Sequence, residues 1–326
     1  MAERRESAAV CWIDHYVVPV TYVEHWLDFY ARVLGAEQRA GFGGDGRGRT
    51  RFTWIGPCHV GGSIVSALPA GKGLGVAAPR YSYYIRPNEI DEHLRRLDEH
   101  QVSHLDPLRT DEEGEEGTVI PFEDPDGNQL EFWAPANMPD GAMDGETSVK
   151  VGRIAAAAFE SRDLTRTRDF YHEFLGLEPA PDIPRDTLAF PLAAGGRLVF
   201  KQADELGTRT LGHTLYHTLH TALIVPEEQF VPILRHLWES LPEWDYDPHH
   251  TVTLSTEEAE SLPARTCIHG APIGTEWKTA VGRGDNFCDW DTNVFHFVPA
   301  APVDGSMAHP KPVDERAYLE AEKKRR

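Results

Sequence analysis

The stretch IDHYVVPVTYVEHWLDFYARVLGAE (residues 13–37) returns in altered form as IAAAAFESRDLTRTRDFYHEFLGLE (residues 154–178). At a shift of 141 positions the two stretches share an Ile at the start, a Phe-Tyr pair and a Leu-Gly pair. Each stretch predicts a strand followed by an amphipathic helix. Each helix is expected to end at a glycine, Gly35 or Gly176, where a left-handed backbone costs little. The chain therefore contains an internal duplication, which has to be recognised before any fold is assigned.

Two further matches extend the duplication. SYYIRPNEIDEHLRRL (82–97) matches ALIVPEEQFVPILRHL (222–237) at a shift of 140, and DPDGNQLEF (124–132) matches DWDTNVFHF (289–297) at a shift of 165. The difference, 165 − 140, indicates an insertion of about 25 residues, placed within about 240–285. Each copy thus holds two strand–helix units followed by more strands.

The copies define the expected domains. We predict an N-terminal domain over 9–136 and a C-terminal domain over 151–302, joined by the polar, Gly- and Pro-containing linker 136–150. A charged tail, 303–326, follows. Alternating short strands and helices predict a layered fold with both element types.

Composition and charge narrow the function. The chain has 32 Lys and Arg against 52 Asp and Glu, a net charge of −20, which argues against a nucleic acid or an anionic membrane as the main partner. No apolar run approaches the ~18–20 residues that span a bilayer, and the start MAERRESAAV lacks the apolar core of a signal peptide. The four cysteines are scattered without a CxxC pair. We expect a cytoplasmic protein with a small-molecule partner.

The order of these motifs resembles the vicinal oxygen chelate superfamily, which includes glyoxalase I, the fosfomycin-resistance proteins, bleomycin-binding proteins and extradiol dioxygenases. The motifs are a strand and helix with FYxxxLG, a second strand–helix unit, and DPDGNxLEF, and they occur twice. The resemblance covers nearly the whole chain. It implies an α+β fold of four βαβββ modules paired into two open-barrel domains. The layout is closest to extradiol-type ring-cleaving dioxygenases, and family habit makes a homodimer possible.

The resemblance also implies where a metal would be held. Its ligands come from the first strand, from the strand that opens the second module, and from the Glu of the terminal LEF motif. The matching positions are His15, Arg80 and Glu131 in copy one, and Ala156, His220 and His296 in copy two. Neither copy alone supplies three ligands.

Some members of the family exchange the first module between their paired domains. That exchange would bring His15, His220 and His296 together as one metal site. The reciprocal set would hold an Arg80–Glu131 ion pair in place of a metal. Pairing without exchange remains an alternative.

Three neutral imidazoles with open coordination positions suit several divalent metals. Fe(II) is our first expectation, with Zn, Ni, Co or Mn as alternatives. His296 stands where the family has a carboxylate, which disfavours hard metals. Strand alternation allows His296 to face inward while Phe295 and Phe297 face the other way. His213 and His217, close to His220, are alternative ligands.

The resulting hypothesis is a metal-dependent dioxygenase that acts on a vicinal diol, a hydroquinone-type or an enolisable keto substrate together with O₂. His250 and Tyr246, within the insertion, are the candidate catalytic residues, and a surface position is the alternative for His250. Asn286 stands where extradiol enzymes carry a Tyr, which argues against ordinary catechol cleavage. The alternatives are a lyase or isomerase of the glyoxalase or epimerase type, and a metal-free binding or resistance protein.

Overall fold

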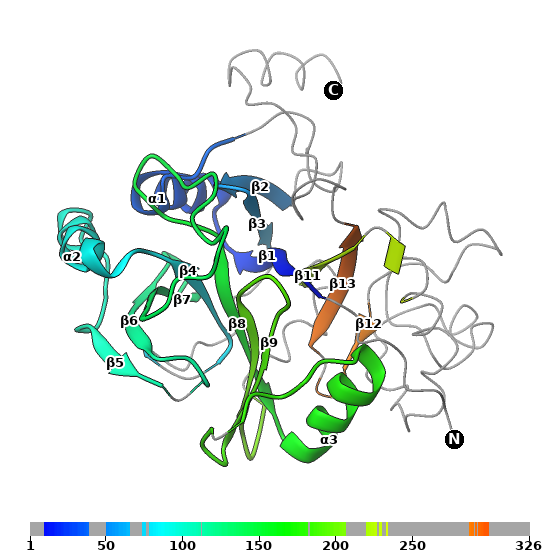
Figure 1. The fold of residues 1–326 in the computed structure, drawn as a ribbon. Coiled ribbons are helices and arrows are strands. Elements are labelled where there is room, and N and C mark those ends of the chain that lie inside the picture. Colours follow the sequence, from blue (N-terminus) through cyan, green and yellow to red (C-terminus); the bar gives the residue numbers. More distant parts are fainter. Residues whose placement is uncertain are drawn as a thin grey trace, which may run out of the picture.

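The computed structural model describes residues 10–38, 50–65, 74–75, 78–111, 113–181, 183–206, 220–226, 228–229, 233, 287–289, 291 and 293–299. Two β-sheets form the body of the described fold, with helices outside them (Figure 1). None of the helices in these ranges is long and apolar enough to cross a membrane. The α+β class implied by the family resemblance is confirmed.

The first sheet combines the beginning and the end of the chain. Its order is β12–β13–β11–β1–β3–β2. The strands are β1 (Trp12–Val20), β2 (Thr50–Ile55), β3 (Cys58–Ile64), β11 (Thr221–Val225), β12 (Phe287–Cys288) and β13 (Val294–Pro299). In Figure 1 the blue strand β1 lies beside β11, and the orange β13 follows.

The second sheet is built from the middle of the chain, in the order β5–β6–β7–β4–β8–β10–β9. The strands are β4 (Arg80–Tyr84), β5 (Leu108–Thr110), β6 (Gly117–Glu123), β7 (Gln129–Pro135), β8 (Ile154–Ser161), β9 (Thr187–Pro191) and β10 (Arg197–Gln202). The helices are α1 (Val23–Leu34), α2 (Ile90–Glu99) after a 3₁₀ turn, η1 (Pro87–Glu89), and α3 (Leu164–Asp169) before a π turn, η2 (Phe170–Phe174).

The predicted helix ends are confirmed. Gly35 caps α1 with a φ of 67°, and Gly176 has the same φ just beyond η2. At Gly35 an added Cβ would lie 2.9 Å from the side chains of Thr147 and Val149. Both the backbone angle and the close contact therefore require glycine at this position.

The two copies exchange their first modules. β1 pairs antiparallel with β11 of the second copy, and β8 pairs antiparallel with β4 of the first. The alternative, in which the strands of one copy share a sheet only with each other, is wrong for the described residues. Each sheet repeats the same scheme, because β1 and β3 are parallel as are β8 and β10, and β11 and β13 are parallel as are β4 and β7.

A cluster of buried tyrosines joins the sheets. The ring of Tyr16, on β1, stacks on Tyr81 of β4 with 3.5 Å between centroids. Its hydroxyl lies 2.6 Å from that of Tyr83, and the Tyr81 hydroxyl lies 3.0 Å from Oγ1 of Thr221. Burial raises the pKa of all three tyrosines, so they remain neutral hydrogen-bonding groups. The cluster fixes β1 and β11 against β4.

Matching turns precede the last strand of each sheet. Asp124 accepts hydrogen bonds from the backbone N–H groups of Asp126 and Asn128 at 2.9 and 2.8 Å. Asp289 accepts the equivalent pair of bonds, both at 3.0 Å, two and four residues further on. The same Asp-based turn is therefore present in both copies. These turns set the start of β7 and of β13.

Candidate functional site

A β-bulge shapes the centre of the first sheet. Ile13 pairs with Leu223, but the next paired residue on β1 is His15, opposite Ala222. Asp14 is thus an extra residue, and a bulge of this kind redirects the side chains beside it. The His15 Nδ1 donates a hydrogen bond to Asp14 Oδ2 at 2.6 Å, because an ionised carboxylate only accepts.

The structure brings the first two predicted ligands together. Nε2 of His15 lies 3.0 Å from Nε2 of His220, although the residues are 205 positions apart. His220 immediately precedes β11, and its carbonyl accepts a hydrogen bond of 2.9 Å from the backbone N–H of Val17. This pairing of β1 with β11 fixes the backbone of His220 beside the bulge. Both imidazoles thus direct the same nitrogen to one place.

The third predicted ligand is known from its backbone register alone. On β13, His296 pairs with Ala222, which in turn pairs with His15 across β11 and β1. The three positions form one row across the sheet and so share a face. The other candidates in the second copy lie outside the described residues: His213, His217, Tyr246, His249, His250, His269 and Trp277.

Asp14 and His59, which the sequence pattern did not indicate as site residues, lie beside His15 and form a cluster of possible metal ligands with it. His59 on β3 pairs with His15, and the two rings stack with 4.0 Å between centroids. Its Nδ1 lies 3.5 Å from Asp14 Oδ2. One donor atom from each of Asp14, His15 and His59 lies within 4.8 Å of the others, so these residues could hold a metal ion. On the far side of His59 the Trp54 ring stacks at 5.3 Å and closes the cluster with an apolar wall.

Burial makes the charge of Asp14 important. Its side chain is 1 % exposed, and Oδ1 has no hydrogen-bond partner among the described residues. A buried carboxylate is costly unless a cation or several donors compensate it. The cluster therefore places imidazole nitrogens beside a buried carboxyl group, and both are donor types that divalent cations bind.

The second sheet repeats this row with different residues. Ala156 of β8 pairs with Arg197 of β10 on one side and with Ser82 of β4 on the other, and Ser82 pairs with Glu131 of β7. The shift between Ser82 and Tyr83 leaves an extra residue on β8 that corresponds to Asp14. Position by position, Arg197 replaces His59, Ala156 replaces His15 and Glu131 replaces His296. Only the last of these three residues is a potential metal ligand.

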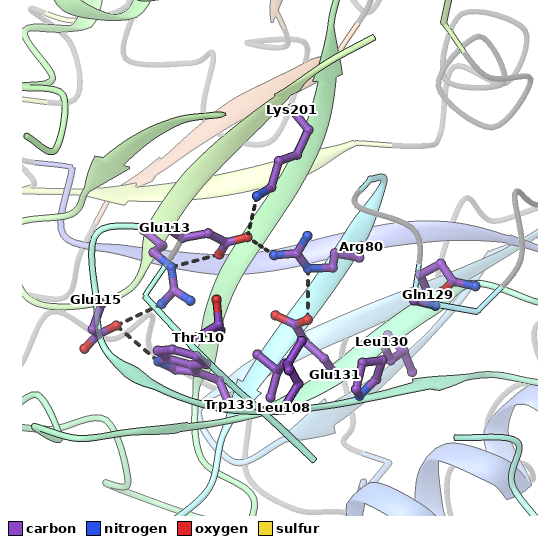
Figure 2. A pocket seen from close by; sticks show the side chains of 14 residues that line it. Arg80, Leu108, Thr110, Glu113, Glu115, Gln129, Leu130, Glu131, Trp133 and Lys201 are labelled. Atoms are coloured by element: carbon purple, nitrogen blue, oxygen red, sulfur yellow. Dashed lines mark hydrogen bonds and ion pairs between the residues drawn. The ribbon is translucent and has the colours of Figure 1, made fainter. Parts of the chain in front are cut away.

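The predicted ion pair between Arg80 and Glu131, which lie in the second sheet, is confirmed. Nε of Arg80 lies 3.0 Å from Oε2 of Glu131, and Figure 2 shows the two side chains facing each other. Arg80 also bonds to Glu113, which enters from the turn between β5 and β6. Burial opposes the charge on Arg80, but these two carboxylates raise its pKa above the ordinary value. In the second sheet the guanidinium of Arg80 therefore stands at the position that corresponds to His220, which precedes β11 of the first sheet.

Comparisons with known proteins agree with this architecture. Residues 12–132 match the model of the Glyoxalase/Bleomycin resistance protein/Dioxygenase superfamily. The fold is similar to that of a Bacillus subtilis subsp. subtilis str. 168 protein with a provisional assignment as a dioxygenase (14 % identity, TM-score 0.61, 98 % of this chain and 97 % of that chain covered). It is also similar to a glyoxalase I variant from Zea mays (13 % identity, TM-score 0.55, 88 % and 92 % coverage). No curated protein matches the sequence.

Proposed function

We propose that this chain is a metal-dependent dioxygenase of the Glyoxalase/Bleomycin resistance protein/Dioxygenase superfamily, whose model residues 12–132 match. The proposed ligands are His15, His220 and His296, and the proposed metal is Fe(II). The substrate would be a small molecule with two adjacent oxygen donors, of the diol, hydroquinone or enolisable keto type. The observation that carries the proposal is the convergence of His15 and His220 from the two copies.

The spacing of the imidazoles fits ligands of one ion. With metal–nitrogen bonds of about 2.1 Å, two ligands at a right angle lie about 3.0 Å apart. The Nε2 atoms of His15 and His220 are separated by 3.0 Å; they hydrogen-bond to each other in this structure, and the same separation would suit two ligands of one ion. The 2.6 Å between His15 Nδ1 and Asp14 is shorter than this and is a hydrogen-bond distance. We therefore assign Nε2 of His15 to the metal, and Nδ1 to Asp14.

Asp14 would act as the positioning residue of the centre. By accepting the Nδ1 proton of His15 it selects the tautomer with a free lone pair on Nε2 and holds the ring in place. Its negative charge would be balanced by the cation on the other side of the imidazole. His59 and Trp54 would exclude water from the β3 side of the centre.

The metal would supply Lewis acidity and a place to bring the substrate and O₂ together. The chain's own residues supply orientation and a dry wall. His250 and Tyr246 stay as proposed acid–base and pocket residues. The proposal also keeps a cytoplasmic setting.

The test is metal analysis of protein purified anaerobically without chelators, followed by oxygen uptake with a panel of catechols, hydroquinones and hydroxyquinols. We expect about one iron per chain, its loss in His220→Ala, and oxygen consumption with at least one substrate. His100→Ala, an exposed position at the end of α2, is the matched control and should retain the metal.

Other outcomes redirect or end the proposal. Zinc or nickel at the same stoichiometry, with turnover in the absence of oxygen, would replace the dioxygenase by a glyoxalase- or epimerase-type enzyme. If reconstitution with Fe(II), Zn and Ni leaves no metal above the level of the His220→Ala variant, the metal site is refuted. Tight ligand binding without turnover would then favour a binding protein.

A further inference from the structure

The second sheet borders a pocket that is arranged around the carboxylate of Glu113. Figure 2 shows the Glu113 side chain pointing between Lys201 and Arg80. Glu113 bonds to Arg80, its Oε2 lies 3.1 Å from Nε of Arg197, and its Oε1 lies 3.5 Å from Nζ of Lys201. Burial opposes ionisation of Glu113, but these three cations outweigh it and hold its pKa at about 2. The group is therefore a buried anion with three cationic partners.

Both arginines of the pocket have further partners besides Glu113. Arg197 is 3 % exposed and its guanidinium lies 4.4 Å above the ring of Trp133. Its NH1 also bonds to Glu115 at 2.9 Å. Arg80 is fixed by Glu131, as described above. Removing Glu113 would leave both guanidinium groups in place with hydrogen-bond donors directed at one point.

The charges of the pocket balance only when Glu113 is counted. Its lining contains three cationic side chains and three carboxylates. Without Glu113 the same lining carries one excess positive charge, which one carboxylate would neutralise. Paired N–H groups of arginine match the two oxygens of a carboxylate better than they match a spherical anion. Without Glu113 the lining would thus match the charge and the geometry of one carboxylate.

We propose that this pocket of the second sheet is a binding site for a small carboxylate, and that the Glu113 carboxylate takes the ligand's place in this structure. The site is separate from the His15–His220 centre and does not depend on the proposed function. The remaining cavity has a volume of about 170 Å³ and is lined partly by apolar side chains. The apolar lining comprises Leu108, Val119, Pro121, Leu130 and Trp133. A carboxylate with a short apolar or aromatic body fits both parts.

Competition with Glu113 sets the expected affinity. A tethered group acts at an effective concentration in the millimolar range or above. A free carboxylate must exceed that concentration to displace Glu113 from the wild-type protein. We therefore expect weak binding in the wild type and binding at least about tenfold tighter once the Glu113 carboxylate is removed.

The test is thermal unfolding of wild-type protein, Glu113→Ala and Glu113→Gln, titrated with acetate or benzoate at constant ionic strength. Chloride and acetamide serve as the controls for charge and for shape. The matched control variant is Glu116→Ala, because Glu116 belongs to the same turn but is exposed and pairs with Arg109 at the surface. The variant Glu113→Ala/Arg197→Met removes the main donor.

We expect a lower Tm for Glu113→Ala and a saturable rise of roughly 5 °C with acetate or benzoate. Acetamide, chloride and the Arg197→Met double variant should give no such rise. If Glu113→Ala folds only in carboxylate buffer, that result supports the site. If it does not fold in any buffer, Glu113→Gln decides by the same titration. Equal responses to carboxylate, chloride and acetamide would overturn the proposal and leave a purely structural ion cluster.

Discussion

Replacing Asp14 by Asn should have opposite effects on the metal-free and the metal-bound protein. Asn has nearly the same shape, and its amide oxygen still accepts the Nδ1 proton of His15. The substitution therefore removes mainly the charge of a side chain that is 1 % exposed. In the metal-free protein the charge is a cost, while in the metal-bound protein it is the compensation of the cation.

The size of both effects follows from the geometry. The unpartnered Asp14 Oδ1 belongs to the class of buried polar groups whose desolvation costs about 1–3 kcal/mol. Relief of part of this cost should raise the Tm of the metal-free protein by roughly 2–4 °C. Loss of a carboxylate behind a metal-binding histidine typically weakens metal affinity 10–100-fold, or about 1.4–2.7 kcal/mol.

The assays are calorimetric unfolding of the metal-free protein at pH 8, where an ordinary imidazole is neutral, and metal titration against a competing chelator. Asp28→Asn is the control, since Asp28 is exposed on α1 and pairs with Arg32 of the same helix. That control should change stability by less than about 0.5 kcal/mol. If Asp14→Asn lowers the Tm of the metal-free protein and leaves metal affinity intact, Asp14 is a structural residue and the proposed role is refuted.

Three further predictions concern stability. Burial lowers the pKa of His93 to about 4, so below pH ~6.5 the unfolded chain binds a proton that the folded chain does not bind. The free energy of unfolding should therefore fall between pH 6.5 and 4. In urea unfolding at pH 4, His93→Gln should recover up to about 3 kcal/mol of this loss, and the exposed control His100→Gln should not. Asp289→Ala should cost about 2–4 kcal/mol in urea unfolding, because two backbone N–H groups lose their acceptor, and a change below 0.5 kcal/mol would contradict this role of the turn. Gly35→Ala should cost about 1–3 kcal/mol in the same assay, through its positive φ and its contact with Thr147, and a neutral effect would show that the helix end can relax.

The repeated local signals of the sequence were sufficient for the architecture. A strand, a helix ending in glycine and an Asp-containing turn are each specified by neighbouring residues, and they recur in the same order. This is why the helix ends at Gly35 and Gly176 could be predicted, whereas the ion pair between Arg80 and Glu131 followed from the positions that the family resemblance implies. The exchange of modules followed from the family resemblance together with the ligand types, because His15 and His220 come together only if β1 joins the second copy.

The bulge could not be predicted in the same way. Regular alternation would direct Asp14 to the face opposite His15, so the sequence pattern argues against their contact. The extra residue on β1 breaks this period and brings the carboxylate to the imidazole. His59 was missed for a related reason, since its closeness to His15 depends on the parallel register of β1 and β3 and not on local sequence.

Glu113 was missed because its neighbours misrepresent its environment. It lies in the run DEEGEE (111–116), which reads as a solvated acidic turn, and Glu116 in that run is indeed exposed. Two of the cations that draw Glu113 inward, Arg197 and Lys201, come from β10, more than eighty residues away. Long-range charge partners of this kind leave no periodic trace in a single sequence.

The two sheets share the same strand pairing and differ in how the charges of their side chains are balanced. In the first sheet the carboxyl group of Asp14 is buried against imidazoles, and we propose that a metal cation from outside the chain completes this centre. In the second sheet the corresponding positions carry arginines and a glutamate, which disfavour a metal and favour a further anion. That anion is supplied by Glu113. We propose that duplication has thereby produced one centre suited to a cation and one pocket suited to an anion, with His59 and Arg197 at equivalent positions of the two sheets.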